Sequence, residues 1–88
     1  MVNWSVVLSR QAVKDAKKLT RSGLKDNALK LLQLLESDPY ANPPRYEKLV
    51  GNLDGYFSRR INIQHRLVYQ VDETTHTVHI LRMWTHYE

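Results

Sequence analysis

Three kinds of side chain in this sequence could together cleave a phosphodiester bond in RNA. They are the carboxylate of Glu47, the guanidinium groups of Arg59, Arg60 and Arg66, and the imidazole of His86. A carboxylate can take the proton from a ribose 2′-hydroxyl, and guanidinium groups can neutralise the charge that develops on the phosphorus. An imidazole can protonate the leaving 5′-oxygen, because it titrates near neutral pH. This chemistry uses no metal ion or other cofactor, and we expect none.

Other residues near these groups carry weaker signals. Tyr87 could stack on an unpaired base, and His65 is either a turn residue or a contact to the substrate. Arg59 and Arg60 alternate across a strand, so at most one of them points toward a given site. Glu47 taken singly could instead be half of a surface ion pair, and the last residues of the chain could be frayed.

A histidine pair elsewhere resembles a metal site only in its spacing. His76 and His79 are three residues apart, in a segment that is expected to begin a strand. Residues at that spacing point to opposite faces of a strand, so the two rings cannot share one metal ion. We therefore expect no metal at this pair.

The candidate residues belong to an α+β domain in which two helices follow a first strand. Ser9 is a candidate N-cap, and Ser22-Gly23 separates two segments whose apolar residues recur at helical spacing. Beyond Asn42-Pro43-Pro44 the helical spacing is lost, and strand-like segments flank two turns. We predict the order βααβββ, with both helices on one face of a mostly antiparallel sheet. The expected strands are 3–8, 46–50, 56–63, 66–71 and 77–84. The first expected helix is 10–21, and the second has an apolar stripe from Leu24 to Leu35 and is closed by Ser37-Asp38-Pro39.

The hairpin expected between residues 46 and 63 brings the candidate residues together. If Val50 lies across from Tyr56, then Glu47 lies across from about Arg59. The next turn brings Arg66 to the same end of the sheet, and the last strand returns its final residues there. The groups expected to converge are Glu47, Arg59 or Arg60, Arg66 and His86.

The composition fits one small domain, 1–88, with a single core. Thirteen Lys and Arg against nine Asp and Glu give a net charge of +4, which favours a polyanion such as nucleic acid as a partner. The absence of cysteine excludes disulfides and thiolate metal sites and favours a reducing cytoplasm. No apolar stretch is long enough to span a membrane, and residues 1–5 lack the pattern of a secretory signal.

Four ordered blocks of the sequence carry a family resemblance. They are Glu47-Lys48-Leu49, the run NLDGYFSRRI at 52–61, His65-Arg66-Leu67-Val68-Tyr69, and His86-Tyr87. In these blocks the sequence resembles the Txe/YoeB group of the RelE superfamily, the ribosome-dependent mRNA-cutting toxins of bacterial toxin–antitoxin pairs. The resemblance covers nearly the whole chain and implies the microbial-RNase-like fold of that group.

The resemblance assigns roles to particular residues. It puts the catalytic Glu at Glu47, the catalytic Arg at Arg66 and the catalytic His at His86, followed by the aromatic Tyr87. It implies cleavage of mRNA in the ribosomal A site, inhibition of translation, and an acidic, YefM- or Phd-like antitoxin whose flexible segment folds onto the toxin. Family members are often dimers, so a homodimer is a further expectation. The expected RNA contacts are Tyr87, Arg59, Arg60, Lys48 and His65.

Two positions depart from the group, and one alternative stays open. Members often carry Lys where Val50 stands, so a phosphate contact is either missing or supplied by Lys48. Glu88 follows the tyrosine that is usually the last residue. ParE-like toxins, which resemble this superfamily in fold, act by binding rather than by catalysis, so a noncatalytic toxin or binding module is the alternative. The three catalytic residue types together favour the nuclease.

Overall fold

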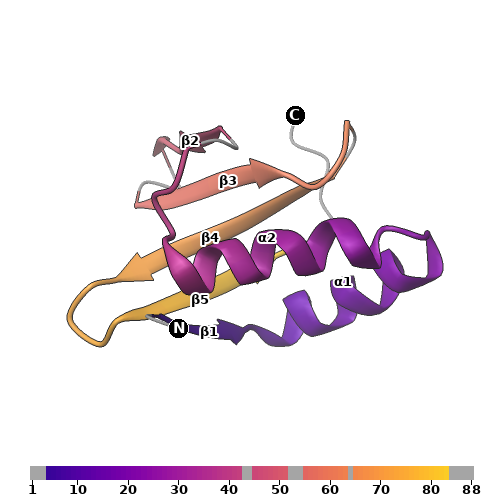
Figure 1. Cartoon of the computed structure of the whole chain (residues 1–88), viewed down its shortest axis with the longest axis horizontal. Helices are drawn as coiled ribbons and strands as arrows, with labels where there is room; N and C mark the ends of the chain where they lie inside the picture. Colours follow the sequence, from indigo (N-terminus) through magenta and orange to yellow (C-terminus); the bar gives the residue numbers. More distant parts are fainter. Residues whose placement is uncertain (1–3, 43–44, 52–54, 64, 84–88) are drawn as a thin grey trace.

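The structure is an α+β fold in which two helices cover one face of a five-stranded sheet (Figure 1). This computed structural model describes residues 4–42, 45–51, 55–63 and 65–83. In that part of the chain the order is βααββββ, which confirms the α+β class and contains all five expected strands, one more than the shorthand order βααβββ counts. The elements are β1 (Ser5–Leu8), α1 (Arg10–Arg21), α2 (Lys25–Ser37), β2 (Tyr46–Lys48), β3 (Tyr56–Arg60), β4 (Arg66–Asp72) and β5 (Thr77–Arg82).

The sheet is mixed, with the strand order β1-β5-β4-β3-β2. β1 pairs with β5 in parallel, and the other neighbouring strands pair in antiparallel fashion. β3 therefore lies between β2 and β4, and side chains on the same face of these three strands are neighbours. This arrangement sets the position of the candidate site.

Local sequence signals explain where the helices begin and end. The Ser9 hydroxyl accepts a hydrogen bond from the Ala12 amide at 3.0 Å and donates one to the Leu81 carbonyl at 2.8 Å, so it caps α1 and ties it to β5. Gly23 then takes a positive φ of 75°, which a residue without a side chain adopts readily, and the chain turns into α2. No helix in the described ranges has the length and apolar character needed to cross a bilayer.

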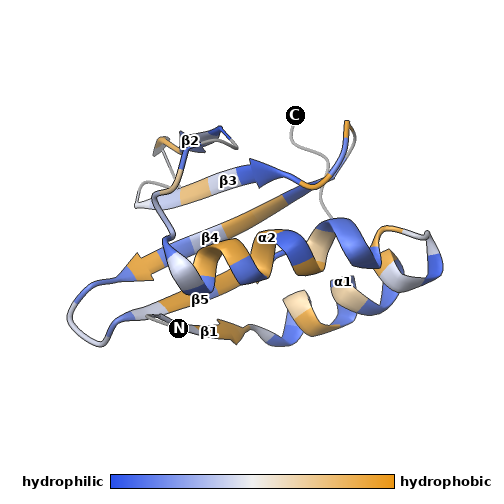
Figure 2. Cartoon of the chain, viewed as in Figure 1, coloured by the Kyte–Doolittle hydropathy of each residue, from blue (hydrophilic) through white to orange (hydrophobic). Residues whose placement is uncertain are grey.

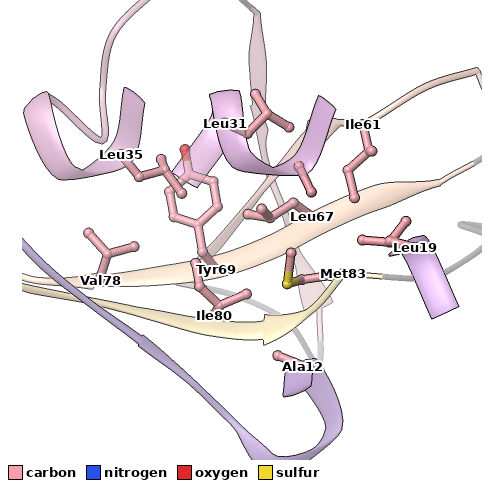
Figure 3. Close-up of a cluster of buried hydrophobic side chains, with 11 residues drawn as sticks. Ala12, Leu19, Leu31, Leu35, Ile61, Leu67, Tyr69, Val78, Ile80 and Met83 are labelled. Carbon is pink, nitrogen blue, oxygen red and sulfur yellow. The ribbon is translucent and has the colours of Figure 1, made fainter. Parts of the chain in front are cut away.

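The hydrophobic core lies between the two helices and the face of the sheet that they cover (Figure 3). Apolar residues recur along α2 and along β4 and β5, separated by polar ones (Figure 2). Burial of each large apolar side chain contributes about 1.5–3 kcal/mol to stability. The core residues include Ala12, Leu19, Leu31, Leu35, Ile61, Leu67, Tyr69, Val78, Ile80 and Met83.

The opposite face of the sheet, which we call the helix-free face, carries the residues that alternate with those of the core. No described helix covers it (Figure 1). Strand alternation and the strand pairing assign residues to this face. On β2, β3 and β4 they are Glu47, Ser58, Arg60, Arg66 and Val68.

Candidate active site

A pocket of about 380 Å³ lies on the helix-free face, over β2, β3 and β4. Arg45, Glu47, Ser58, Arg60 and Arg66 line it. Three guanidinium groups against one carboxylate leave these lining residues with a net charge of +2 at neutral pH. Guanidinium groups match the geometry of phosphate oxygens, so the pocket suits a phosphate group next to a single carboxylate.

Glu47 and Arg66 form an ion pair that reaches across β3. Arg66 Nη1 donates to Glu47 Oε1 at 3.2 Å, and 48% of the Glu47 side chain remains exposed. A partly exposed pair of this kind contributes only about 0–1 kcal/mol. The pairing can therefore be exchanged for contacts to a bound anion at small cost.

The β2–β3 register differs by one residue from the one expected. Glu47 lies across from Ser58, so its expected pairing with Arg59 is wrong. At the end of this ladder the Leu49 amide donates to the Tyr56 carbonyl at 2.9 Å, so Leu49 takes the place expected for Val50.

The difference corresponds to a longer connection between the two strands. The connection takes up residues 50–55, one residue more than a loop of 51–55 would. Gly51 and Gly55 have positive φ angles of 71° and 93°, which glycine adopts without strain. Val50 is 83% exposed in this loop, so it is not part of the ladder.

The change of register puts Arg59 on the core face and Arg60 on the helix-free face, because a one-residue shift moves every side chain to the other side. Arg59 is 1% exposed. Its Nε donates to the Tyr69 hydroxyl at 3.0 Å, and its Nη2 donates to the carbonyls of Pro39 and Ala41 at 2.9 and 2.8 Å. The structure therefore corrects the expectation that Arg59 contacts RNA: its guanidinium holds the loop after α2.

Tyr69 completes this buried network. Its hydroxyl accepts from Arg59 and donates to the Pro39 carbonyl at 3.0 Å. Burial raises the pKa of Tyr69 above its usual value, although the charge of Arg59 opposes the shift. The hydroxyl therefore keeps its proton and can donate at neutral pH.

Two further expected RNA contacts lie outside the pocket. Lys48 alternates with Glu47 along β2 and lines a separate pocket beside the 50–55 loop. His65 is 4% exposed and closes the β3–β4 turn, where its amide donates to Asn62 Oδ1 at 2.7 Å and its carbonyl accepts from the Ile61 amide at 2.9 Å. Of the two interpretations of His65, the structure supports the turn residue. Neither Lys48 nor His65 lines the pocket that contains Glu47 and Arg66.

The roles expected for His86 and Tyr87 fall on residues 84–88, which lie outside the described part of the chain. The expected convergence is therefore observed for Glu47, Arg60 and Arg66 only. His86 as the proton donor and Tyr87 as a stacking partner stay predictions.

A buried carboxylate fixes the last described residues of the chain. Asp15, on α1, is fully buried and accepts hydrogen bonds from Arg82 Nε at 3.0 Å, the Met83 amide at 3.1 Å and Gln11 Nε2 at 2.9 Å. Burial alone would raise the pKa of Asp15, but these hydrogen bonds and the charge of Arg82 outweigh it and lower the pKa below 3.8. Asp15 is therefore an anionic link between α1 and the end of β5.

The two histidines at metal-like spacing have separate surroundings. The ring of His76 stacks on Trp4, with 3.9 Å between ring centres. His79 lines another pocket, with Val7 and Tyr56. Among the residues that the structure describes, no three His, Cys, Asp or Glu side chains form a group able to hold a metal.

Sequence reasoning missed two residues of the pocket, Arg45 and Ser58. Arg45 is two positions before Glu47, and Ser58 is two positions before Arg60. The period of two along a strand puts such residues on one face, so this signal was present in the sequence. Using it for Ser58 required the correct hairpin register.

Solved structures that this fold matches include bacterial toxins. The "YoeB/ParE toxin" of Agrobacterium tumefaciens is 26% identical, with a TM-score of 0.84 over 94% of this chain and 99% of that one. YoeB of Staphylococcus aureus, solved as a dimer, is 33% identical, with a TM-score of 0.81 over 97% of this chain and 99% of that one. The fold is thus that of a class of small toxins of the YoeB and RelE kind.

A sequence model of the YoeB-like toxins of bacterial type II toxin–antitoxin systems matches residues 9–87. The chain therefore belongs to the YoeB-like toxin family. Toxin YoeB of Mycobacterium bovis is 39% identical over 64 residues, which are 70% of this chain and 65% of that protein. Toxin YoeB of Synechocystis is 46% identical over 41 residues, 47% of this chain and 48% of that protein. The matched segments thus span about half to two thirds of these curated relatives.

Proposed function

We propose that this chain is an endoribonuclease toxin that acts without a metal ion. It cuts mRNA in the ribosomal A site and so inhibits translation in the cytoplasm. The observation that carries this proposal is the pocket on the helix-free face, where Glu47 is paired with Arg66 beside Arg60 and Arg45. Nucleases that depend on Mg²⁺ hold the ion with carboxylates, usually together with substrate phosphate. Glu47 is the single acidic residue among the described residues lining this pocket, which supports acid–base chemistry instead.

The proposed reaction uses the RNA's own 2′-hydroxyl as the nucleophile. Glu47 accepts the proton of that hydroxyl while its oxygen forms a bond to phosphorus. The bond from phosphorus to the 5′-oxygen breaks, which leaves a 2′,3′-cyclic phosphate and a 5′-hydroxyl. Arg66 and Arg60 neutralise the charge on the phosphorane oxygens, and their charges are permanent at any physiological pH. The family resemblance supports His86 as the donor of the proton to the 5′-oxygen.

We also propose an acidic antitoxin as the partner of this chain. The YoeB of Staphylococcus aureus, 33% identical to this chain, was solved in a complex with YefM. The net charge of +4 and the three arginines of the pocket favour a negatively charged segment. A disordered acidic segment that folds across the pocket would cover Glu47 and Arg66 and block RNA. The Staphylococcus aureus YoeB dimer supports a homodimer as a further proposal.

The test is a purified translation system in which mRNA is mapped by primer extension. We expect cuts inside the A-site codon when toxin and ribosomes are both present, and no cuts with either omitted. Glu47→Gln should slow cleavage by about a hundredfold or more, because the substitution removes the general base. Glu73→Gln is the matched control: Glu73 is exposed in the β4–β5 turn, and its variant should cut at the wild-type rate.

Two outcomes would contradict the proposal. Growth arrest by Glu47→Gln as strong as by the wild type would indicate a toxin that acts by binding, the alternative kept open above. A metal bound at stoichiometric occupancy in active protein, found by elemental analysis, would contradict the metal-independent mechanism.

A further inference from the structure

Ser58 is a buried polar residue in the wall of the pocket. Its side chain is 1% exposed, and in the described structure its hydroxyl has no hydrogen-bond partner. Buried hydroxyls are nearly always paired, since an unpaired one loses its hydrogen bonds to water and gains nothing in return. An unpaired hydroxyl in a candidate active site therefore indicates a partner that arrives during function.

Glu47 is in position to be that partner. The Leu49 amide bonds to the Tyr56 carbonyl, and an antiparallel ladder repeats its bonding every two residues. Glu47 and Ser58 are thus a directly bonded pair, with both side chains on the helix-free face. The Cβ atoms of such pairs lie about 5 Å apart. The ion pair between Glu47 and Arg66 also joins β2 to β4 across β3, the strand that carries Ser58.

The other neighbour of Ser58 in the same row offers no acceptor. Val68 lies across from Ser58 on β4, is 2% exposed and has an apolar side chain. In this row a carboxylate on Glu47 is the strongest acceptor available to the Ser58 hydroxyl.

Substrate binding would release the Glu47 carboxylate from Arg66. An RNA phosphate carries several oxygens that match the guanidinium fork, so it competes directly with Glu47 for Arg66. The ion pair is partly exposed and weak, so the competition favours a well-placed phosphate. Glu47 then needs another donor to keep its carboxylate oriented.

We propose that Ser58 is a positioning residue that donates a hydrogen bond to the Glu47 carboxylate once a phosphate has taken Arg66. One carboxylate oxygen accepts from Ser58, and the other stays available to accept the proton of the 2′-hydroxyl. This inference deepens the proposed function and rests on it, since it concerns the geometry of the general base.

The kinetic test compares Ser58→Ala and Ser58→Thr with the wild type and with Ser37→Ala, an exposed serine at the end of α2. Ser58→Ala should lower the single-turnover cleavage rate at saturating ribosomes by about ten- to a hundredfold, as for a lost hydrogen bond to a charged group. Its ribosome affinity should be unchanged, and its melting temperature should not fall, because the hydroxyl it removes is unpaired when no substrate is bound. Ser58→Thr keeps the hydroxyl and should recover most of the rate.

Two kinetic results would overturn the proposal. One is cleavage by Ser58→Ala within twofold of the wild-type rate. The other is a rate loss that follows a fall in melting temperature, which would indicate a structural role. If the threonine variant melts early because its extra methyl group does not fit, the nearly isosteric Ser58→Cys takes its place and should recover part of the rate.

A second test does not depend on cleavage and so separates this inference from the proposed function. Crystals of the chain grown in sulfate should show the anion on Arg66 and a Glu47 oxygen about 2.7 Å from Ser58 Oγ. In sulfate-free crystals Glu47 should stay on Arg66. Glu47 remaining on Arg66 in the sulfate crystals, or an Arg66 that binds no sulfate, would contradict the exchange, whereas absence of ribosome-dependent cutting by the wild type would contradict the proposed function alone.

Discussion

Adjacent arginines have different surroundings in this protein because they lie on opposite faces of one strand. Arg59 points into the core side, where it bonds to Tyr69 and to two carbonyls of the loop after α2 and stacks 4.7 Å above the ring of Tyr46. Arg60 is exposed and lines the pocket with Glu47. One arginine therefore stabilises the fold, and the other is available to a substrate.

Alanine substitutions should separate these two roles. Arg59→Ala leaves buried carbonyls without their charged donor, so it should lower the free energy of unfolding by about 3 kcal/mol or more. Arg60→Ala should change stability by no more than about 0.5 kcal/mol, as for an ordinary surface position, and yet slow cleavage. Urea unfolding and single-turnover cleavage measured on both variants check this. Equal loss of stability in the two variants would contradict the assignment of faces.

At this scale the types of the site residues could be predicted from the sequence, but their directions could not. Glu47 and Arg66 form an ion pair in the pocket, and both are expected at the site from chemistry and resemblance. The length of the hairpin loop decides which face of β3 is occupied by Arg59, Arg60 and Ser58. A difference of one residue in that length exchanges the two faces of the strand. Composition and spacing do not determine that length.

At the scale of elements, a buried link joins α1 to the end of β5. Asp15 receives hydrogen bonds from Arg82 and from the Met83 amide, so the helix holds the strand at the last described residues. The Ser9 hydroxyl makes a second link, to the Leu81 carbonyl. These contacts fix the point from which the chain continues toward His86.

The link through Asp15 should make stability depend on pH. The folded-state pKa of Asp15 is lowered below 3.8, so its contribution is complete above about pH 4 and is lost as the pH falls through the lower, folded-state value. Asp15→Asn should lower the free energy of unfolding by about 2–3 kcal/mol at pH 7. The difference in free energy of unfolding between this variant and the wild type should become smaller in acid.

Chemical unfolding of both proteins between pH 7 and pH 2 measures this difference. Asp26→Asn, in the exposed first turn of α2, is the control and should cost at most about 1 kcal/mol. A difference between Asp15→Asn and wild type that stays constant down to pH 2 would show that the charge of Asp15 contributes nothing.

The helices were easier to predict than the sheet. The predicted range of the first helix, 10–21, matches α1, because the Ser9 cap and the Ser22-Gly23 turn are local signals. The second helix ends at Ser37, within the Ser37-Asp38-Pro39 run that is expected to close it. Strands β2, β3 and β5 are shorter than predicted, and β4 ends at Asp72 rather than Val71. Strand ends depend on partners far away in the sequence, which no local pattern contains.

At the scale of the whole molecule, the two faces of the sheet have separate tasks. The helices and the core occupy one face, and the pocket occupies the other, so residues on the helix-free face can serve chemistry without interrupting the core. The outer side of α1 adds positive charge through exposed residues such as Lys14 and Lys17. We expect this charge to act on affinity for a large RNA-containing partner rather than on bond cleavage.

Removing this charge should weaken binding without slowing chemistry. The double variant Lys14→Ala/Lys17→Ala should bind ribosomes less tightly and lower the slope of log affinity against log salt by roughly one to two. Its single-turnover rate at saturating ribosomes should equal that of the wild type. Gln33→Ala, an exposed neutral position on α2, should change neither quantity. A slower cleavage rate at saturation would place these lysines in the catalytic step.

The central claim is that the pocket activates the 2′-hydroxyl of the RNA itself. Its most direct test is an mRNA with a single 2′-deoxyribose at the mapped cut position, placed in the A site and compared with the all-ribose mRNA in single-turnover cleavage. We predict no cut at the modified position and full cutting of the matched mRNA, with equal binding of toxin to both ribosome complexes. Cutting of the deoxy substrate at the rate of the all-ribose one would mean that water is the nucleophile, and the role assigned to Glu47 would be wrong.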